Sequence, residues 1–440
     1  MATPDPATQV RGRLDPAPRY YPPFVTLKRR LANGPSAAPP TASPSGVTVE
    51  GIEDWLLGPA IGETDLLVLF ESLVWRMIAT GLPLERASVH VGTLHPQLLG
   101  FAWNWNVADS LTDEVKVDMA ALDTTQYRSN PLYHVIEHGQ SFSLDPQDPA
   151  TRARYPLMAE LADRGLTHYL AVPLSAGGSY HNAATVATGR AGGFTPAELA
   201  GIRRILRPFA LHVERHIAQQ ISANVLDTYL GTAAGAQVLH GAIKRGSGEA
   251  IRAVIWISDL RGFTDLTDRL PAADVLALLN AYFEQMAGSV IAHGGEVLKF
   301  IGDGLLAVFP FTSEAEGRTA AEAALAAAEQ AIAAVDALSA TPPPALAAIA
   351  GRQPLRSGIA LHEGEVFFGN VGAPDRLDFT VIGRAVNTAS RVEALCKPLG
   401  REILVTAPVA ARLTQSLDSL GAQSLRGVAE PIALFAPPVR

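Results

Sequence analysis

Residues 254–264 read VIWISDLRGFT, and residues 295–309 read GEVLKFIGDGLLAVF. In each stretch an apolar run of strand length leads to one aspartate, Asp259 in the first and Asp303 in the second. The second aspartate lies in a Gly-Asp-Gly turn between two apolar runs, which predicts a β-hairpin with the carboxylate at its tip. Divalent cations such as Mg²⁺ prefer carboxylate oxygens, and two-metal sites use them for phosphoryl transfer. The two stretches together therefore predict a metal-dependent site for phosphoryl or nucleotidyl transfer.

Two further segments carry groups suited to a phosphorylated substrate. Gly262, Phe263 and Thr264 follow the first aspartate, where a glycine lets backbone amides approach phosphate oxygens and the threonine adds a hydroxyl. Asn387 and Arg391, in the string GRAVNTASR, are four residues apart and share one face of a predicted helix. Taken alone, the first segment is an ordinary strand-to-helix turn and the second a solvated helix face.

These motifs resemble the metal-binding and catalytic motifs of the class III adenylate/guanylate cyclases. The resemblance implies a ferredoxin-like α/β catalytic domain that converts a nucleoside triphosphate to a cyclic nucleotide and pyrophosphate. It places two Mg²⁺ or Mn²⁺ ions at Asp259, Leu260 and Asp303. It also implies that Asn387 orients the ribose and that Arg391 meets the charge that develops on the α-phosphate. The chain has no P-loop and no set of kinase motifs.

Lys299 and Thr380 fall at the positions that select the base in this family. The lysine hydrogen-bonds the adenine ring in adenylate cyclases, where guanylate cyclases typically have glutamate. Because a lysine only donates, it matches adenine N1, an acceptor, and not the N1–H of guanine. Thr380, three residues before Gly383, resembles a subgroup known as IIIb that uses a hydroxyl where many members have aspartate. ATP is the expected substrate, and GTP stays open because a hydroxyl both donates and accepts.

The resemblance also implies a homodimer. In this family two catalytic domains pair head to tail, so that one supplies the metal-binding aspartates and the other the base-selecting and transition-state residues. This chain carries both sets once, which predicts two equivalent composite sites. Arg426, in the string LRGVAEP, is a candidate contact for the terminal phosphates, with a structural turn as the alternative. A catalytically silent nucleotide-binding dimer is the rival function from another class.

The bulk properties of the chain exclude several other classes of protein. Its 440 residues carry a net charge of −8 without a basic block, which argues against a nucleic-acid partner. Its single cysteine, Cys396, excludes an intrachain disulfide and fits a reducing compartment. No run approaches the roughly eighteen apolar residues of a membrane span, because Glu71 and Arg76 interrupt the best candidate, 66–82. We expect a cytoplasmic protein without a transmembrane segment.

Composition divides the chain into four parts. Residues 1–47 are rich in Pro, Ala, Ser and Thr and predict a disordered tail. Residues 48–218 predict an α+β domain, 219–250 a helical transducer linker, and 251–440 the α/β catalytic domain. In the catalytic domain, helices are expected at 271–293, 313–340 and 384–397, and strands at 253–258, 296–301, 305–309, 357–362, 365–369, 377–382, 402–405 and 432–435.

The order of elements in residues 48–218 resembles a GAF-type sensor domain, with a PAS-like domain as the alternative. Its closing helix has a clear start, with Thr195 as cap, Pro196 next and Glu198 completing a capping box, and is expected to run to about Gln219. A sensor at this place implies an unknown small-molecule or protein signal. Four aromatic residues are candidates for a pocket or, more simply, for the core: Trp103, Trp105, Tyr169 and Tyr180.

Overall fold

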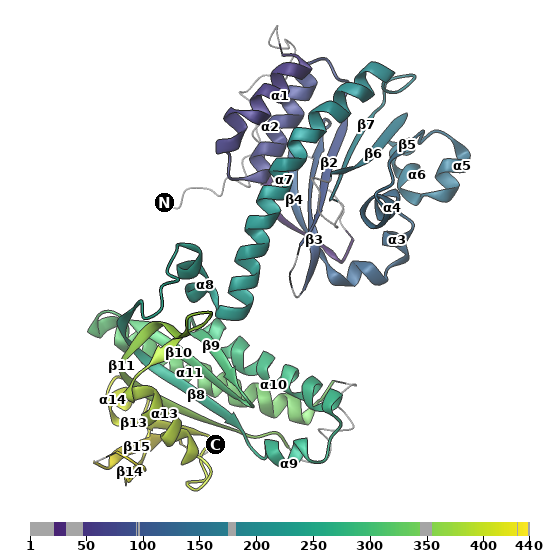
Figure 1. Cartoon of the computed structure of the whole chain (residues 1–440). Coiled ribbons are helices and arrows are strands. Elements are labelled where there is room, and N and C mark those ends of the chain that lie inside the picture. Colours follow the sequence, from purple (N-terminus) through teal and green to yellow (C-terminus); the bar gives the residue numbers. More distant parts are fainter. Residues whose placement is uncertain are drawn as a thin grey trace. The chain divides into compact units, whose positions relative to one another are not determined.

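The computed structural model describes residues 22–31, 47–93, 95, 97–174, 182–343, 354–428 and 430–438. The chain forms two compact units, unit 1 (Met1–Val225) and unit 2 (Leu226–Arg440) (Figure 1). Each unit contains a sheet and hydrophobic clusters of its own, so each is described by itself.

Unit 1 is built on a seven-stranded antiparallel sheet in the order β1-β4-β3-β2-β7-β6-β5 (Figure 1). The strands are β1 (Val25–Leu31), β2 (Arg86–Gly92), β3 (Leu98–Asn106), β4 (Leu111–Asp118), β5 (Phe142–Leu144), β6 (His168–Leu174) and β7 (Asn182–Thr188). The helices are α1 (Val49–Leu57), α2 (Leu66–Ala79), α3 (Thr125–Arg128), α4 (Pro131–His138), α5 (Pro149–Arg154), α6 (Pro156–Asp163) and α7 (Pro196–Leu230), with 3-10 turns η2 (Pro59–Gly62) and η3 (Met119–Asp123).

Alternation along the strands divides the side chains of unit 1 between two cores. On β6, Leu170 packs with the helices α1, α2 and α7, whereas its neighbour Tyr169 packs with α4 and α6. Trp103 and Trp105 of β3 belong to the first core, so these aromatic residues are core residues, as is Tyr169. Tyr180 lies outside the described residues. The sheet is thus covered on both faces.

Part of the expected disordered tail is a strand. Val25–Leu31 forms β1 and pairs antiparallel with β4, which corrects the prediction for this segment. The reason is ion pairing with residues that are distant in sequence. Asp113 and Glu114 of β4 are almost completely buried. Arg30 Nε lies 2.6 Å from Asp113 Oδ1, and Lys28 Nζ lies 2.9 Å from Glu114 Oε1. A buried carboxylate without a partner is costly, so these cations hold the strand in place.

The closing helix of unit 1 is longer than predicted. The capping box at its start is confirmed, because Glu198 N–H donates to Thr195 Oγ1 and Thr195 N–H donates to Glu198 Oε2. However, α7 continues past Gln219 to Leu230 and ends at Gly231, whose φ of +85° suits glycine. The linker predicted over 219–250 is therefore mostly helical, as the end of α7 and α8 (Thr232–Leu239), and α8 packs onto the sheet of unit 2 through Ala234.

Unit 2 contains an eight-stranded mixed sheet in the order β14-β15-β13-β11-β8-β10-β9, with β12 paired to β11. The strands are β8 (Gly248–Leu260), β9 (Glu296–Ile301), β10 (Gly304–Phe311), β11 (Ser357–Ala373), β12 (Arg376–Ile382), β13 (Ile403–Thr406), β14 (Asp418–Gln423) and β15 (Ile432–Ala436). The helices are α9 (Phe263–Thr267), α10 (Ala272–Ala292), α11 (Glu314–Ala340), α13 (Arg384–Ala394) and α14 (Ala407–Ala410).

Two strands predicted at 357–362 and 365–369 are one strand, β11, and β14 was not predicted. Strand β11 continues through Gly364 without a break. The glycine leaves room for Ala385 of α13, because a Cβ added at position 364 would lie 2.5 Å from the Ala385 Cβ. The helices expected at 271–293 and 313–340 are confirmed as α10 and α11, and the Ser313 cap of α11 accepts from Glu316 N–H.

Helices α10 and α11 are long and apolar enough to span a membrane by length and composition. In the structure their apolar residues serve a different purpose. Leu278, Tyr282 and Met286 of α10, and a row of alanines of α11, are buried against one face of the unit 2 sheet. Core packing accounts for this part of their apolar surface, whereas Leu276 and Ile291 of α10 are exposed.

Glu71 of α2 generates a testable pH dependence of stability. Its side chain is 4% exposed within the unit 1 core, and its Oε1 has no hydrogen-bond partner among the described residues. Burial raises the pKa of Glu71 to about 7. Between the ordinary pKa and this value the folded state holds a proton that the unfolded state has released, so stability falls as pH rises through this range.

We expect the free energy of unfolding of unit 1 to fall by about 2 to 3 kcal/mol between about pH 5 and pH 8, and Glu71→Gln to remove most of this fall. Urea titrations followed by tryptophan fluorescence would measure it, because four of the five tryptophans lie in unit 1. Glu160→Gln, at an exposed ion pair with Arg164, is the matched control. An unchanged pH slope in Glu71→Gln would contradict the assignment.

Candidate active site

The two predicted metal aspartates lie side by side at one end of the unit 2 sheet. Asp259 is the penultimate residue of β8, and Asp303 lies in the turn between β9 and β10. The register pairs Leu305 with Ser258, which brings Asp259 level with Gly304. An added Cβ on Gly304 would lie 3.6 Å from Asp259 Oδ1. The hairpin predicted from sequence therefore exists and delivers both carboxylates to one place.

A buried hydrogen-bond chain holds the end of β8 in position. The hydroxyl of Tyr282, on α10, lies 2.7 Å from Ser357 Oγ on β11. Ser357 Oγ in turn donates to the backbone carbonyl of Asp259 at 3.0 Å. Because Tyr282 and Ser357 are both buried, these contacts are shielded from water and fix the backbone from which the first carboxylate projects.

The carboxylates around β8 destabilise one another. Burial, and then the charge of Asp303, raise the pKa of Asp259. Glu393, on α13, is also buried, and burial together with the charges of Asp259 and Asp303 raises its pKa to about 7. Arg261 offsets part of this repulsion, since its guanidinium lies 3.7 Å from Glu393 Oε1. The site therefore contains an excess of acidic groups that a bound cation would relieve.

The donor set fits hard divalent cations such as Mg²⁺ or Mn²⁺. Asp259 and Asp303 offer carboxylate oxygens, and these ions take one or two carboxylates and complete their shell with water and phosphate oxygens. Leu260 is 1% exposed and packs into the core, so only its backbone carbonyl can serve as a ligand. Among the described residues, no group of three or more His, Cys, Asp or Glu side chains lies together as a metal site.

The loop after Asp259 has a left-handed glycine and open space beside it. Gly262 has a φ of +73°, in the left-handed region, and precedes the short helix α9, which begins at Phe263. Space around the Cα of Gly262 is open, with no atom within 4 Å of an added Cβ. Thr264 is exposed in the first turn of α9. The three residues predicted to contact phosphate thus lie directly beside the carboxylate pair.

Asn387 and Arg391 lie on α13, on a face turned away from the aspartates. Glu393 is buried and interacts with Arg261 and both aspartates, so its side of α13 faces the aspartate pair. Each residue of an α-helix advances about 100°, so Arg391 is rotated by roughly 200° from Glu393. Asn387 is exposed and Arg391 half-buried at the opposite side. Within one chain, the predicted transition-state residues are therefore not directed at the predicted metal ligands.

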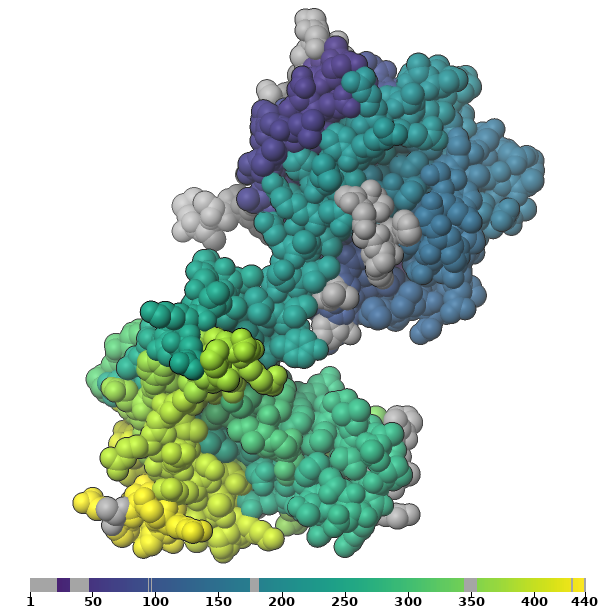
Figure 2. Space-filling model, viewed as in Figure 1, coloured from purple at the N-terminus to yellow at the C-terminus, as the bar shows by residue number. Residues whose placement is uncertain are grey.

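Lys299 and Thr380 lie on β9 and β12, which approach one another across the sheet. The structure adds a residue that the sequence analysis missed. Lys299 Nζ forms an ion pair with Asp378, which precedes Thr380 by two residues and so lies on the same face of β12. Asp378 is largely exposed, whereas Thr380 is nearly buried. The sequence signal was the alternation along β12, which places position 378 beside position 380. The segment with β12 and α13 lies at the surface of unit 2 (Figure 2, lime green).

Arg426 lies in the loop between β14 and β15 and is exposed. The next residue, Gly427, has a φ of +73°, and an added Cβ there would lie 3.4 Å from an Arg391 guanidinium nitrogen. The loop therefore packs beside the predicted transition-state residue, on the side of α13 away from the aspartates. Arg261, Tyr282, Ser357 and Glu393 were also not predicted, because only the fold brings them to the site.

Comparisons with known proteins agree with the motifs of unit 2. Residues 249–435 match the model of the adenylate and guanylate cyclase catalytic domain. An adenylate cyclase of Anabaena cylindrica is 34% identical over 172 residues, which is 39% of this chain and 33% of the relative. The terminal-differentiation-specific adenylate cyclase of Dictyostelium discoideum is 30% identical over 188 residues, 41% of this chain and 8% of the relative. This chain thus spans a third or less of the length of these curated relatives.

Among solved structures, a bacterial light-regulated adenylyl cyclase is 28% identical with a TM-score of 0.44, over 53% of this chain and 63% of the other. An adenylyl cyclase from P. aeruginosa is 26% identical with a TM-score of 0.38, over 44% of this chain and 97% of the other. The family match and the paired aspartates of the β8 end and the β9–β10 turn identify residues 249–435 as a class III adenylate/guanylate cyclase catalytic domain.

Proposed function

We propose that this protein is an adenylate cyclase that converts ATP to 3′,5′-cyclic AMP and pyrophosphate at sites formed between two copies of the chain. The observation that supports it most directly is the carboxylate pair Asp259 and Asp303 beside the Gly262 loop. Bound metal ions would lower the pKa of the ribose 3′-hydroxyl and neutralise charge on the triphosphate. A cytoplasmic location fits a single buried thiol, Cys396.

The chain's own residues then have distinct roles. Asp259 and Asp303 hold the metal-bound triphosphate, and the backbone amides after Arg261 contact its phosphate oxygens. Arg391 donates to the oxyanion that develops on the α-phosphate, an interaction that is strongest in the transition state. Asn387, one turn earlier on α13, orients the ribose. Arg426, in the loop against Arg391, is the proposed contact for the terminal phosphates.

The geometry of α13 supports the proposal of a head-to-tail homodimer. Arg391 and Glu393 lie on opposite sides of this helix, and it is Glu393 that faces the aspartates of its own chain. A second copy related by a two-fold axis would bring its Arg391 and Asn387 to the aspartates of the first copy. The first copy would supply the same residues to the second, which yields two equivalent sites.

We also propose that unit 1 is a GAF-type sensor domain that regulates the cyclase. The support is that α7 is one helix from Pro196 to Leu230 and continues, after Gly231, into α8 on the sheet of unit 2. Removal of residues 1–218 is therefore expected to change kcat or the dimer dissociation constant at least severalfold. Equal values for the fragment and the full chain would contradict regulation by this domain.

The composite site makes a prediction for mixed variants. Asp303→Asn weakens metal binding and Arg391→Ala removes transition-state stabilisation, so each alone is expected to lower kcat by on the order of a hundredfold or more. An equimolar mixture allowed to exchange subunits is expected to regain about one quarter of wild-type activity, because half the dimers are mixed and each has one intact site. Cyclic AMP formation with Mn²⁺ and ATP would measure this.

Asp265→Asn is the matched control for the carboxylate change, because Asp265 is an exposed residue of α9 close to the site. It is expected to keep wild-type activity. If the mixture of Asp303→Asn and Arg391→Ala stays inactive although subunits exchange, the site lies within one chain and the dimer proposal is wrong.

The ion pair of Lys299 with Asp378 makes a prediction for base selection. Asp378 positions the ammonium that donates to adenine N1, while Thr380 accepts from the exocyclic amine. Asp378→Asn is expected to raise KM for ATP about threefold to tenfold with a smaller effect on kcat, because the base is bound equally in ground and transition states. Lys299→Ala is expected to lower the ATP-to-GTP ratio of kcat/KM more than tenfold.

Asp375→Asn, in the exposed turn before β12, is the control for Asp378→Asn and is expected to leave KM unchanged. The wild-type assay separates the alternatives for the function itself. Cyclic GMP from GTP without cyclic AMP from ATP would show a guanylate cyclase. Neither product, even with Mn²⁺, would show a catalytically silent nucleotide-binding dimer.

A further inference from the structure

Unit 1 contains a cavity of about 310 Å³ that the proposed cyclase reaction does not use. Strands β2, β3 and β4 form its floor, and helices α3, α4 and α6 form the opposite wall. Phe24, just before β1, closes one side. This volume lies at the lower end of the range of small-molecule sites in proteins. The cavity therefore has room for a compact organic ligand.

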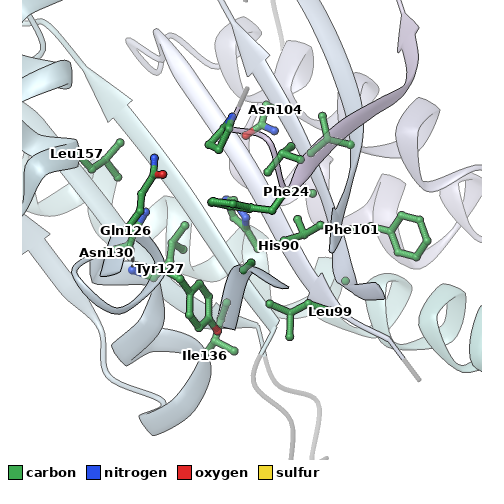
Figure 3. A pocket seen from close by; sticks show the side chains of 18 of the residues that line it. Phe24, His90, Leu99, Phe101, Asn104, Gln126, Tyr127, Asn130, Ile136 and Leu157 are labelled. Atoms are coloured by element: carbon green, nitrogen blue, oxygen red, sulfur yellow. Dashed lines mark hydrogen bonds between the residues drawn. The ribbon is translucent and has the colours of Figure 1, made fainter. Parts of the chain in front are cut away.

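The walls of the cavity are mostly apolar and incompletely packed. Ala102 and Val115 on the strands are buried, whereas Phe24, Leu99, Ile136 and Leu157 are only half-buried. Figure 3 shows Leu157, Tyr127 and Ile136 on one side, Phe24 and Leu99 on the other, and His90 between them. Apolar side chains that face a space they do not fill gain dispersion contacts when an apolar ligand enters.

His90 supplies a hydrogen-bonding group inside the cavity. Its Nε2 lies 2.9 Å from Ser88 Oγ, and Ser88 Oγ lies 2.6 Å from Thr185 Oγ1 on β7. These hydrogen bonds fix the plane of the imidazole ring. Among the residues that the structure describes, no hydrogen bond is made to the other ring nitrogen, Nδ1. A ligand in the cavity can therefore bond Nδ1 without displacing a protein group.

The charges around the cavity favour an uncharged ligand. Burial, and then the charge of Arg86, lower the pKa of His90 to about 3, so the ring is neutral near pH 7. Arg86 also lines the cavity and is engaged in an interaction of its own within the protein, whereas Glu160 and Arg164 are more than half exposed and pair with each other at 3.1 Å. Burying a charged ligand here would need a dedicated counter-ion, and burying a neutral one would not.

We propose that this cavity binds a small, uncharged aromatic molecule with one hydrogen-bonding group, such as a hydroxyl or a ring N–H, that bonds His90 Nδ1. The aromatic body lies against Phe24 and Tyr127, and its polar group reaches the floor of the sheet. The site gives unit 1 a specific ligand class that is independent of the nucleotide site in unit 2.

The test uses three probes of one shape on the full chain near pH 7: 2-naphthol, naphthalene and 2-naphthoate. Equilibrium dialysis would measure their dissociation constants. We expect 2-naphthol to bind saturably at sub-millimolar concentration and about tenfold more tightly than naphthalene, because of one hydrogen bond. The anionic 2-naphthoate is expected to bind at least tenfold more weakly than 2-naphthol.

Two variants assign the binding to this cavity. His90→Phe keeps a ring of similar size but removes the nitrogen, so the ratio of 2-naphthol to naphthalene affinity is expected to fall to about one. A merely structural role of His90 would weaken both probes equally and leave the ratio unchanged, which would overturn the contact. His138→Phe, at an exposed position at the end of α4, is the matched control and is expected to keep the ratio.

Ile136→Trp narrows the cavity from the half-buried wall and is expected to weaken all three probes at least tenfold while the melting temperature stays within a few degrees. Binding that survives this change lies elsewhere, and the proposal is then wrong. The proposal would also be overturned if 2-naphthol did not bind the wild type saturably. It would be overturned as well if 2-naphthoate bound more tightly than 2-naphthol, because that result would show an anion site. Cyclase activity plays no part in these measurements.

Discussion

The repulsion between Asp259 and Asp303 is the constraint on which the rest of unit 2 depends. Strand pairing forces the two carboxylates together, since β8 and β10 are in register up to the turn that carries Asp303. Burial and the neighbouring charge raise the pKa of Asp259, and Glu393 adds a third acidic group behind them. The hydrogen bonds from Tyr282 to Ser357 and from Ser357 to the Asp259 carbonyl oppose a movement of β8 that would relieve the repulsion. A folded state under such strain is stabilised by any cation that binds it and not the unfolded chain.

Packing against the sheet explains the arrangement of α13. Its buried face must place residues against β8 and β11, and Ala385, Ala389 and Val392 do so. Glu393 continues this face and is held near Arg261, for which Gly358 leaves room, because an added Cβ there would lie 2.2 Å from the guanidinium. With this face fixed, helical geometry turns Asn387 and Arg391 outward. The chain therefore carries the predicted metal ligands and the predicted ribose and transition-state residues on two different sides of α13.

Sequence reasoning succeeded where the information is local. The Gly-Asp-Gly hairpin, the capping boxes at Thr195 and Ser313, and the amphipathic α10 were all predicted, because a few adjacent residues determine them. Sequence reasoning failed where residues distant in the sequence determine the local structure. β1 forms because β4 buries two carboxylates, and Gly364 lies inside a strand because α13 packs against it. The cavity in unit 1 was equally invisible, since its lining comes from separate strands, helices and turns between Pro22 and Arg164.

The ion pair of Lys299 with Asp378 differs from the aspartate pair, because it joins opposite charges. A free ammonium at the base position would be strongly hydrated, and it would have to lose that water when adenine arrives. Paired with Asp378, Lys299 already has one partner and a fixed direction, so that base binding uses a remaining donor of the ammonium and orders less of the side chain. Because Asp378 stays largely exposed, the pair adds little to stability on its own. In the proposed adenylate cyclase its contribution is orientation: the lysine would present only donors toward the base, which suits the N1 acceptor of adenine and leaves the N1–H of guanine without a partner.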